Sequence, residues 1–283
     1  MLIREFDVQL PDGRTLHAYD TADAGSREGL TVVWNHGTPN IGLPPEPLFP
    51  ASERLGIRWL SYDRPNYGGS SPKIGRDVAS AAADVAAIAD AAGVDRFATM
   101  GHSGGAMHAL ACSALLPDRV LCVVGASALA PYSAEGLDWF AGMAPLGVAT
   151  LRAAAAGREA KERYEASAVD DGSAFTPADH AALAGEWSWF NSVVGPALRD
   201  GPGGLIDDDL AYVNPWGFEP SRVRSPVLLL HGDEDRVAPV AHAEWLAGRI
   251  PDVELRVVPG EGHVSVLGSA AATLDWLAAR VAG

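Results

Sequence analysis

The sequence predicts an α/β fold: a mostly parallel, doubly wound sheet of about eight strands, with a helical lid inserted after the sixth strand. Short apolar runs alternate along the chain with segments of helical periodicity. Several runs are apolar without alternation, which is typical of parallel strands covered by helices on both faces. After the sixth apolar run this alternation stops, and from about residue 133 to residue 215 we find helical patterns but no convincing strand.

The first two predicted strands form a hairpin. REFDVQL and TLHAYD flank Pro11, Asp12 and Gly13, which together are a turn signal. Further strands are predicted at LTVVWNH, IRWLSYD, FATMGH, VLCVVGA, VLLLHGD and ELRVVPG. Each of the last four runs ends in a turn that is polar or contains glycine.

Two helices of the predicted core have clear apolar stripes at steps of three and four residues. The first stripe comprises Val78, Ala81, Val85, Ile88 and Ala92, with Gly93 as the expected stop. The second comprises Leu267, Ala271, Leu274, Ala278 and Val281. We expect both helices to pack on the sheet.

The segment without predicted strands divides the chain into a core of residues 1–132 and 216–283 and a helical lid of residues 133–215. Aromatic residues gather in or at the edge of the lid: Trp139, Phe140, Trp187, Trp189, Phe190 and Trp216. We predict that Trp187, Trp189, Phe190 and Trp216 line an apolar substrate pocket. The alternative is an extra helical layer with an aromatic core.

Composition restricts the class of protein. The chain has 283 residues, 48% of them hydrophobic and 20% charged, as in a globular protein with a sizeable core. The formal net charge of −15 argues against nucleic acids and anionic membranes as partners, because their phosphates would be repelled. We expect a small-molecule substrate.

The N-terminal segment, the apolar runs and the cysteines indicate the cellular compartment. The N-terminal segment lacks the apolar core of a signal peptide, and no run approaches the length of a membrane span. Cys112 and Cys122 lie in apolar segments, so neither a disulfide framework nor a zinc site is expected. We predict a cytoplasmic protein that needs no metal or organic cofactor.

The segment GHSGG, residues 101–105, joins a predicted strand to a predicted helix. A serine at such a turn takes a strained backbone conformation, and glycines on either side let neighbouring chain pass. The helix that follows directs backbone N–H groups to where negative charge develops in acyl transfer. These features favour Ser103 as a nucleophile.

A nucleophilic serine needs a base, and eight histidines are available. His263 is favoured because it lies in a Gly-rich loop after the last strand, where its side chain can hang over the sheet edge. His242 lies in a predicted helix and is expected on the surface. The other histidines are expected to be structural: His36 and His231 at turns, His102 on the face opposite to Ser103, His108 packed in a helix, His17 in the hairpin and His180 in the lid.

The base in turn needs a carboxylate that orients it. The loop GDEDRVAP follows a strand and offers Asp233 and Asp235. We favour Asp235, which is deeper in the loop, and expect Asp233 to stabilise the turn. The acidic run 207–209 is predicted to be solvated or capping, although Asp209 could face a lid pocket.

The loop HGTPN after a central strand is predicted to complete an oxyanion hole. Pro39 has no N–H group, so the donor there is the amide of Thr38. The second donor is the amide of Gly104.

Taken together, HGTPN, YDRPNYGGSSP, GHSGG, GDEDRVAP and GEGH, in this order, make the sequence resemble the α/β-hydrolase family in its lid-bearing branch. The resemblance covers essentially the whole chain. It implies Ser103 as nucleophile, His263 as base, Asp235 as its orienting group, and the Thr38 and Gly104 amides as oxyanion donors. The organisation is similar to that of proline iminopeptidases, but GHSGG and HGTPN depart from their patterns.

The resemblance implies hydrolysis of a carboxylic ester through an acyl-enzyme intermediate. Three alternatives on the same fold stay open: an aminopeptidase, amidase or lactonase; a cofactor-free perhydrolase or oxygenase; and a non-catalytic ligand-binding protein.

Overall fold

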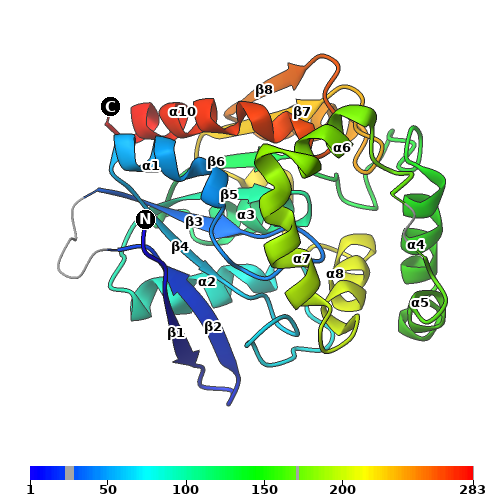
Figure 1. Cartoon of the computed structure of the whole chain (residues 1–283), viewed down its shortest axis with the longest axis horizontal. Coiled ribbons are helices and arrows are strands. Elements are labelled where there is room, and N and C mark those ends of the chain that lie inside the picture. The colour runs from blue at the N-terminus through cyan, green and yellow to red at the C-terminus, as the bar shows by residue number, and fades with distance from the viewer. Residues whose placement is uncertain (23–28, 170–171, 283) are drawn as a thin grey trace.

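The computed structural model describes residues 1–22, 29–169 and 172–282 (Figure 1). In these ranges eight strands form one sheet with the order β1-β2-β4-β3-β5-β6-β7-β8. The strands are β1 (Arg4–Gln9), β2 (Thr15–Asp20), β3 (Leu30–Asn35), β4 (Ile57–Tyr62), β5 (Phe97–His102), β6 (Val120–Ala126), β7 (Val227–Gly232) and β8 (Val253–Val258). β1 pairs antiparallel with β2, and β2 pairs antiparallel with β4, whereas the other neighbours are parallel. The predicted hairpin and mostly parallel sheet are confirmed.

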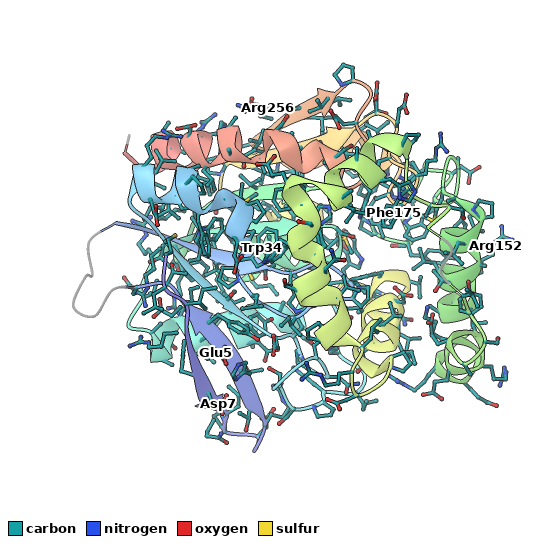
Figure 2. All side chains as sticks on the ribbon, in the orientation of Figure 1. Glu5, Asp7, Trp34, Arg152, Phe175 and Arg256 are labelled. Carbon is teal, nitrogen blue, oxygen red and sulfur yellow. The ribbon has the colours of Figure 1, made fainter. Side chains whose placement is uncertain are left out.

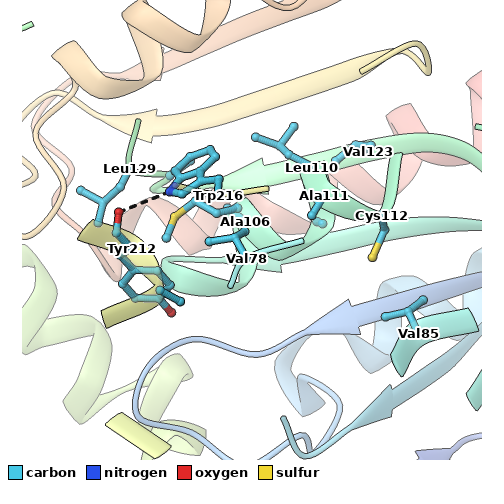
Figure 3. Packing of buried hydrophobic residues seen from close by; sticks show 14 of the residues in the cluster. Val78, Val85, Ala106, Leu110, Ala111, Cys112, Val123, Leu129, Tyr212 and Trp216 are labelled. Atoms are coloured by element: carbon cyan, nitrogen blue, oxygen red, sulfur yellow. Dashed lines mark hydrogen bonds between the residues drawn. The ribbon is translucent and has the colours of Figure 1, made fainter. Parts of the chain in front are cut away.

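Helices cover both faces of the sheet. The core helices are α1 (Phe49–Leu55), α2 (Ser80–Ala91), α3 (Gly104–Leu115), α9 (Ala241–Ala247) and α10 (Ala270–Ala282), with short 3-10 turns η1 (Glu46–Leu48), η3 (Pro220–Arg222) and η4 (Ser265–Ser269). The sheet has two apolar faces because successive side chains of a strand point in opposite directions. Val33 thus packs in a cluster with α2, α3 and α9, part of which Figure 3 shows. Trp34, labelled in Figure 2, packs in a second cluster with α10.

Between β6 and β7 the described residues form helices and no strand. This insertion contains α4 (Pro145–Ala155), α5 (Arg158–Glu165), α6 (Pro177–Ala184), η2 (Glu186–Phe190), α7 (Asn191–Ala197) and α8 (Gly203–Val213). Figure 1 shows these helices on one side of the molecule and the two chain ends on the opposite side. A helical insertion after the sixth strand is therefore present, while the exact division at residues 132 and 216 stays a prediction.

Two further sequence expectations concern the core and the membrane. Cys112 and Cys122, which lie in apolar segments of the sequence, are both buried and free. No helix in the described ranges has the length and apolar character needed to cross a membrane.

Candidate active site

Ser103 occupies the sharp turn between β5 and α3. Its backbone has φ 55° and ψ −128°, a conformation that costs free energy in a residue with a side chain. The turn is enforced on both sides, since the Ser103 amide donates a 2.9 Å hydrogen bond to the Ala126 carbonyl and the Ser103 carbonyl accepts one from Ala106. The serine is therefore held at the carboxyl edge of the sheet, as predicted.

The glycines around Ser103 are required by close backbone contacts. A Cβ on Gly101 would clash with the backbone of Gly105, and a Cβ on Gly105 would clash with the backbone of Asn35 in β3. The tight approach of α3 to β5 and β3 thus depends on the two glycines that the sequence motif supplies.

His263 and Asp235 meet in the loops that follow β8 and β7. The Nδ1 atom of His263 lies 2.8 Å from Oδ2 of Asp235, and both residues are buried. The other oxygen of Asp235 accepts 2.8 Å hydrogen bonds from the amides of Val237 and Ala238. The carboxylate is therefore fixed by its own loop and in turn orients the imidazole.

Asp235 and His263 each stabilise the charged form of the other. Burial by itself would lower the pKa of His263, but the negative charge and hydrogen bond of Asp235 raise it above the ordinary value. Burial opposes ionisation of Asp235, yet its interactions with His263 hold its pKa below the ordinary value. Asp235 is therefore a carboxylate at neutral pH, and the imidazole is poised to take up a proton.

Two cavities meet at Ser103. The histidine-side cavity has a volume of about 260 Å³ and is lined by Ser103, His263, His102, Asn40, Phe190 and their neighbours. The helix-side cavity has a volume of about 220 Å³ and is lined by Ser103, Gly104, Leu129, Thr150, Asp209, Tyr212 and their neighbours. Thr38, Ser103 and Phe175 line both cavities, and Figure 2 shows Phe175 on the side of the molecule that the insertion covers.

Where the two cavities meet, the Ser103 hydroxyl and two backbone amides have no hydrogen-bond partner among the described residues. The Ser103 hydroxyl makes no hydrogen bond to any residue that the structure describes, and it shares the histidine-side cavity with His263. The amides of Thr38 and Gly104 likewise donate to no described group. Both of these residues line the helix-side cavity with Ser103, so two N–H donors remain available to an anionic ligand atom.

The aromatic residues expected in the pocket divide into two groups. Phe190 lines the histidine-side cavity. Trp187, Trp189 and Trp216 are buried in the hydrophobic clusters and line neither cavity at Ser103. Trp216 belongs to the hydrophobic cluster of Figure 3 and donates a 3.3 Å hydrogen bond to the Tyr212 carbonyl. These three tryptophans belong to an aromatic core, which was the alternative interpretation.

The remaining histidines are structural. His242 is buried, not exposed as predicted: its Nδ1 accepts a hydrogen bond from the Ala130 amide and its Nε2 donates to the Trp139 carbonyl. His102 also differs from expectation, because its side chain lines the histidine-side cavity and Nε2 donates to the His263 carbonyl. Burial lowers the pKa of His102 to about 3, so this ring stays neutral.

The acidic run 207–209 in α8 is buried and paired, so the prediction of a solvated or capping cluster was wrong. Asp208 lies between two guanidinium groups, 2.6 Å from Arg64 and 2.6 Å from Arg76. Burial opposes its ionisation, but the two arginines hold its pKa well below the ordinary value. Asp209 lines the helix-side cavity, as the sequence analysis allowed.

Sequence reasoning missed the cluster that fixes the Thr38 loop. Arg64 donates to the carbonyls of His36 and Gly37, and the Thr38 hydroxyl donates a 2.5 Å hydrogen bond to Asp208. Tyr212 contacts the same hydroxyl at 2.6 Å, and a Cβ on Gly104 would clash with the Tyr212 hydroxyl. The insertion thus supports the loop that carries the Thr38 amide.

Asp179 of α6 was missed as well. Its carboxylate accepts hydrogen bonds of 2.7 and 2.8 Å from the amides of Val264 and Ser265, directly after His263. The same carboxylate accepts from the amide and hydroxyl of Thr176, forming a capping box. The motif T-x-x-D at the start of a helix signals the cap, but it gives no sign of the second contact.

The part of the chain that the structure describes contains no group of three His, Cys, Asp or Glu residues arranged to hold a metal ion.

Comparison with known proteins identifies the family to which this fold belongs. Residues 31–270 match the model of the alpha/beta hydrolase fold family. The non-heme chloroperoxidase of Streptomyces lividans is 31% identical over 233 residues, which cover 78% of this chain and 80% of that protein. The pimeloyl-[acyl-carrier protein] methyl ester esterase of Aromatoleum aromaticum is 44% identical over 52 residues, covering 18% of this chain and 21% of that protein.

One solved structure has a similar fold over nearly its whole length. The enol-lactonase from Burkholderia xenovorans LB400 superimposes with a TM-score of 0.70 at 18% identity, covering 99% of this chain and 100% of that one. Because the family match spans most of the sheet and the whole insertion, the chain belongs to the α/β-hydrolase family of enzymes.

Proposed function

We propose that this protein is a serine hydrolase that cleaves carboxylic esters through an acyl-enzyme intermediate. The observation that carries the proposal is that Ser103, on its strained turn, and His263, oriented by Asp235, line one cavity. In this proposal Ser103 is the nucleophile, His263 the general base and Asp235 the group that fixes the imidazole.

Acylation begins with attack by Ser103. His263 Nε2 takes the hydroxyl proton while Oγ bonds to the ester carbonyl carbon, and the carbonyl oxygen becomes negatively charged. The free amides of Thr38 and Gly104 donate to this oxygen, and the N-terminus of α3 favours the negative charge. One such donor typically contributes about 3 kcal/mol to stabilising the transition state.

The two cavities receive the two halves of the ester. The bond to the leaving alcohol breaks when the His263 imidazolium gives its proton to the alcohol oxygen. That oxygen must lie beside His263, which lines only the histidine-side cavity of the two. We therefore assign the alcohol to the histidine-side cavity and the acyl group to the helix-side cavity. Water activated by His263 then releases the acid.

The comparisons support an acyl-transfer reaction but leave its substrate open. The relative from Aromatoleum aromaticum is named a methyl ester esterase, and the structure from Burkholderia xenovorans a lactonase. Lactone or amide cleavage would use the same residues, so the test includes these substrates.

Covalent labelling tests the proposal. A fluorophosphonate probe should label the purified protein at Ser103, and a panel of esters, lactones and aminoacyl amides should show turnover of esters. Ser103→Ala should abolish both labelling and turnover while circular dichroism stays unchanged. Labelling without turnover of any substrate would favour a ligand-binding protein, and turnover by Ser103→Ala near the parental rate would refute the assignment.

A second activity, perhydrolysis, is favoured by the relative from Streptomyces lividans, which is named a non-heme chloroperoxidase. Hydrogen peroxide would replace water in the second step: its oxygen attacks the acyl-enzyme carbonyl, His263 takes the proton, and a peracid leaves as Ser103 regains its hydroxyl. The peracid then oxidises halide in solution. Halogenation that depends on peroxide, a carboxylic acid and Ser103 would support this activity, whereas halogenation by Ser103→Ala would contradict it.

A further inference from the structure

The helix-side cavity combines an apolar wall with one charged group. Leu129, Leu146, Leu151, Leu205 and Val237 supply apolar wall residues. Asp209 of α8 lines the same cavity, although only 9% of its side chain is exposed. A carboxylate in so apolar a site calls for an explanation, because burying it costs free energy unless both oxygens have partners.

Among the residues that the structure describes, partners reach only one oxygen of Asp209. Oδ2 lies 2.6 Å from Nζ of Lys161 and accepts a 3.3 Å hydrogen bond from the Thr150 hydroxyl. Oδ1 accepts no hydrogen bond from any of the residues described, although a carboxylate oxygen can accept two. The missing partner must come from whatever fills the cavity.

The charge around Asp209 determines the kind of partner. Lys161 is fully buried and also lies 2.5 Å from Glu165, so one ammonium group faces two carboxylates. Burial raises the pKa of Asp209, and Lys161 opposes this effect. Lys161 and Glu165 do not line the cavity, whereas Asp209 and Thr150 do, and Oδ1 is the Asp209 oxygen to which no described residue donates. This end of the cavity therefore favours a hydrogen-bond donor and disfavours an anion.

We propose that the acyl group of the preferred substrate carries a hydrogen-bond donor, a hydroxyl or an ammonium group, which binds Oδ1 of Asp209. The proposal rests on the ester hydrolysis proposed above and on the assignment of the acyl group to the helix-side cavity. The acyl chain lies against the apolar wall, and its donor completes the hydrogen bonding of the buried carboxylate. Asp209 is in this sense the residue that selects the substrate.

Matched esters test this selection. We would measure kcat/KM for methyl hexanoate and methyl octanoate beside their ω-hydroxy and ω-amino counterparts. The donor-bearing ester of at least one pair should be preferred by about tenfold or more, because a plain alkyl group leaves Oδ1 unpaired. The hydroxy and amino arms identify which donor the site takes, and preference for either supports the proposal.

Asp209→Asn is the decisive variant. Lys161 will hold the amide oxygen, so the amide NH2 group turns to the cavity and presents a donor in place of an acceptor. The preference for donor-bearing esters should fall to within about twofold, and esters that end in a ketone should gain in relative kcat/KM. Glu165→Gln is the matched control: it removes the other carboxylate from Lys161 without changing the cavity wall, and should keep the preference.

A binding measurement separates selection from folding and chemistry. Ser103→Ala should bind the preferred donor-bearing ester about tenfold more tightly than the plain ester, and the double variant with Asp209→Asn should not. Equal rates for plain and donor-bearing esters, or a preference that survives Asp209→Asn, would overturn this proposal alone, since plain esters would still be hydrolysed. A preference seen only for donors in the alcohol part would overturn it as well. Failure to cleave any ester would instead overturn the proposed function.

Discussion

The carboxylate of Asp179 accepts a 2.7 Å hydrogen bond from the backbone amide of Val264, although the two residues are 85 positions apart in the sequence. Asp179 belongs to the helical insertion, and Val264 directly follows His263. Asp208, also in the insertion, fixes the loop of Thr38 in a similar way. The insertion thus covers the candidate site and also supports the two loops that would supply its base and one oxyanion donor.

Asp179→Asn should impair both stability and catalysis. The carboxylate accepts from the amides of Val264 and Ser265 with one oxygen and from Thr176 with the other. An amide cannot accept on both sides, so one set of donors loses its partner. We expect a loss of about 1–3 kcal/mol in the free energy of unfolding and a kcat lower by about tenfold to a hundredfold, measured by thermal denaturation and ester hydrolysis.

Thr176→Ala is the control for Asp179. It removes the hydroxyl from the helix cap at a cost of about 1 kcal/mol but leaves the bonds to the His263 loop. Its kcat should stay near the parental value. If the two variants lose kcat equally, Asp179 acts through the helix alone and the loop contact is unimportant.

Asp208→Ala should be among the most destabilising single changes in the insertion. It leaves the buried guanidinium groups of Arg64 and Arg76 without their shared carboxylate. Breaking such a buried ion pair costs about 3–5 kcal/mol, which chemical denaturation will measure. Asp275→Ala breaks the exposed pair with Arg54 and should leave the midpoint unchanged. Similar midpoints for both variants would contradict the role of Asp208.

Local sequence patterns were sufficient to predict the sheet and the residues at its carboxyl edge. A parallel strand must be apolar on both faces, and the turn at Ser103 requires small neighbours, so both features leave marks within a few residues. Asp235 and His263 each follow a strand, and strands of one parallel sheet end at the same edge. Their meeting therefore follows from topology.

Contacts between the insertion and the core could not be predicted in this way. The partner of Asp208 is 144 residues away in Arg64, and no local pattern links the two. One signal was available: three successive acidic residues of a helix span about 200° of its circumference, so with apolar neighbours on both sides at least one must be buried. A buried carboxylate needs a cationic partner, and the two arginines after β4 were the missing half.

For the tryptophans, the sequence analysis predicted a contact with the substrate where the structure shows core packing. Trp187 and Trp189 were expected to line a pocket because they gather in a segment that covers the site. Their side chains are instead almost fully buried, 2% and 6% exposed, and pack with Trp34 of the sheet and its neighbours. Large aromatic residues contribute most by burial, so an aromatic cluster in an insertion indicates first how the insertion is attached.

Gly105→Ala should prevent the turn at Ser103 from forming. The added Cβ would clash with the backbone of Asn35 and His36, which cannot move without displacing β3. We expect a loss of at least about 3 kcal/mol, or no soluble protein. Gly195→Ala in α7 is the matched change, because a Cβ added there meets no described heavy atom within 4 Å beyond its chain neighbours and the backbone of its own helix. It should stabilise the protein by up to about 1 kcal/mol, since alanine favours a helix. Equal stabilities of the two variants, by thermal denaturation, would contradict the packing argument.

Asp235→Asn should shift the pH dependence of hydrolysis. The proposed base works only when His263 is neutral, and Asp235 raises the pKa of His263 above 6.5, so wild-type kcat/KM should fall as the pH drops through a pKa above that value. The asparagine removes the negative charge that stabilises the imidazolium. The pKa of His263 then falls, the acid limb moves to lower pH, and the plateau drops by about 10³–10⁴-fold because the imidazole loses its orienting acceptor. Asp233→Asn in the same loop is the control. Asp233 accepts a hydrogen bond from the Gly260 amide, so this variant should leave the acid limb of the pH profile in place. A profile of kcat/KM between about pH 5 and pH 9 measures both variants, and an acid limb that Asp235→Asn leaves unmoved would show that His263 is not the group that titrates.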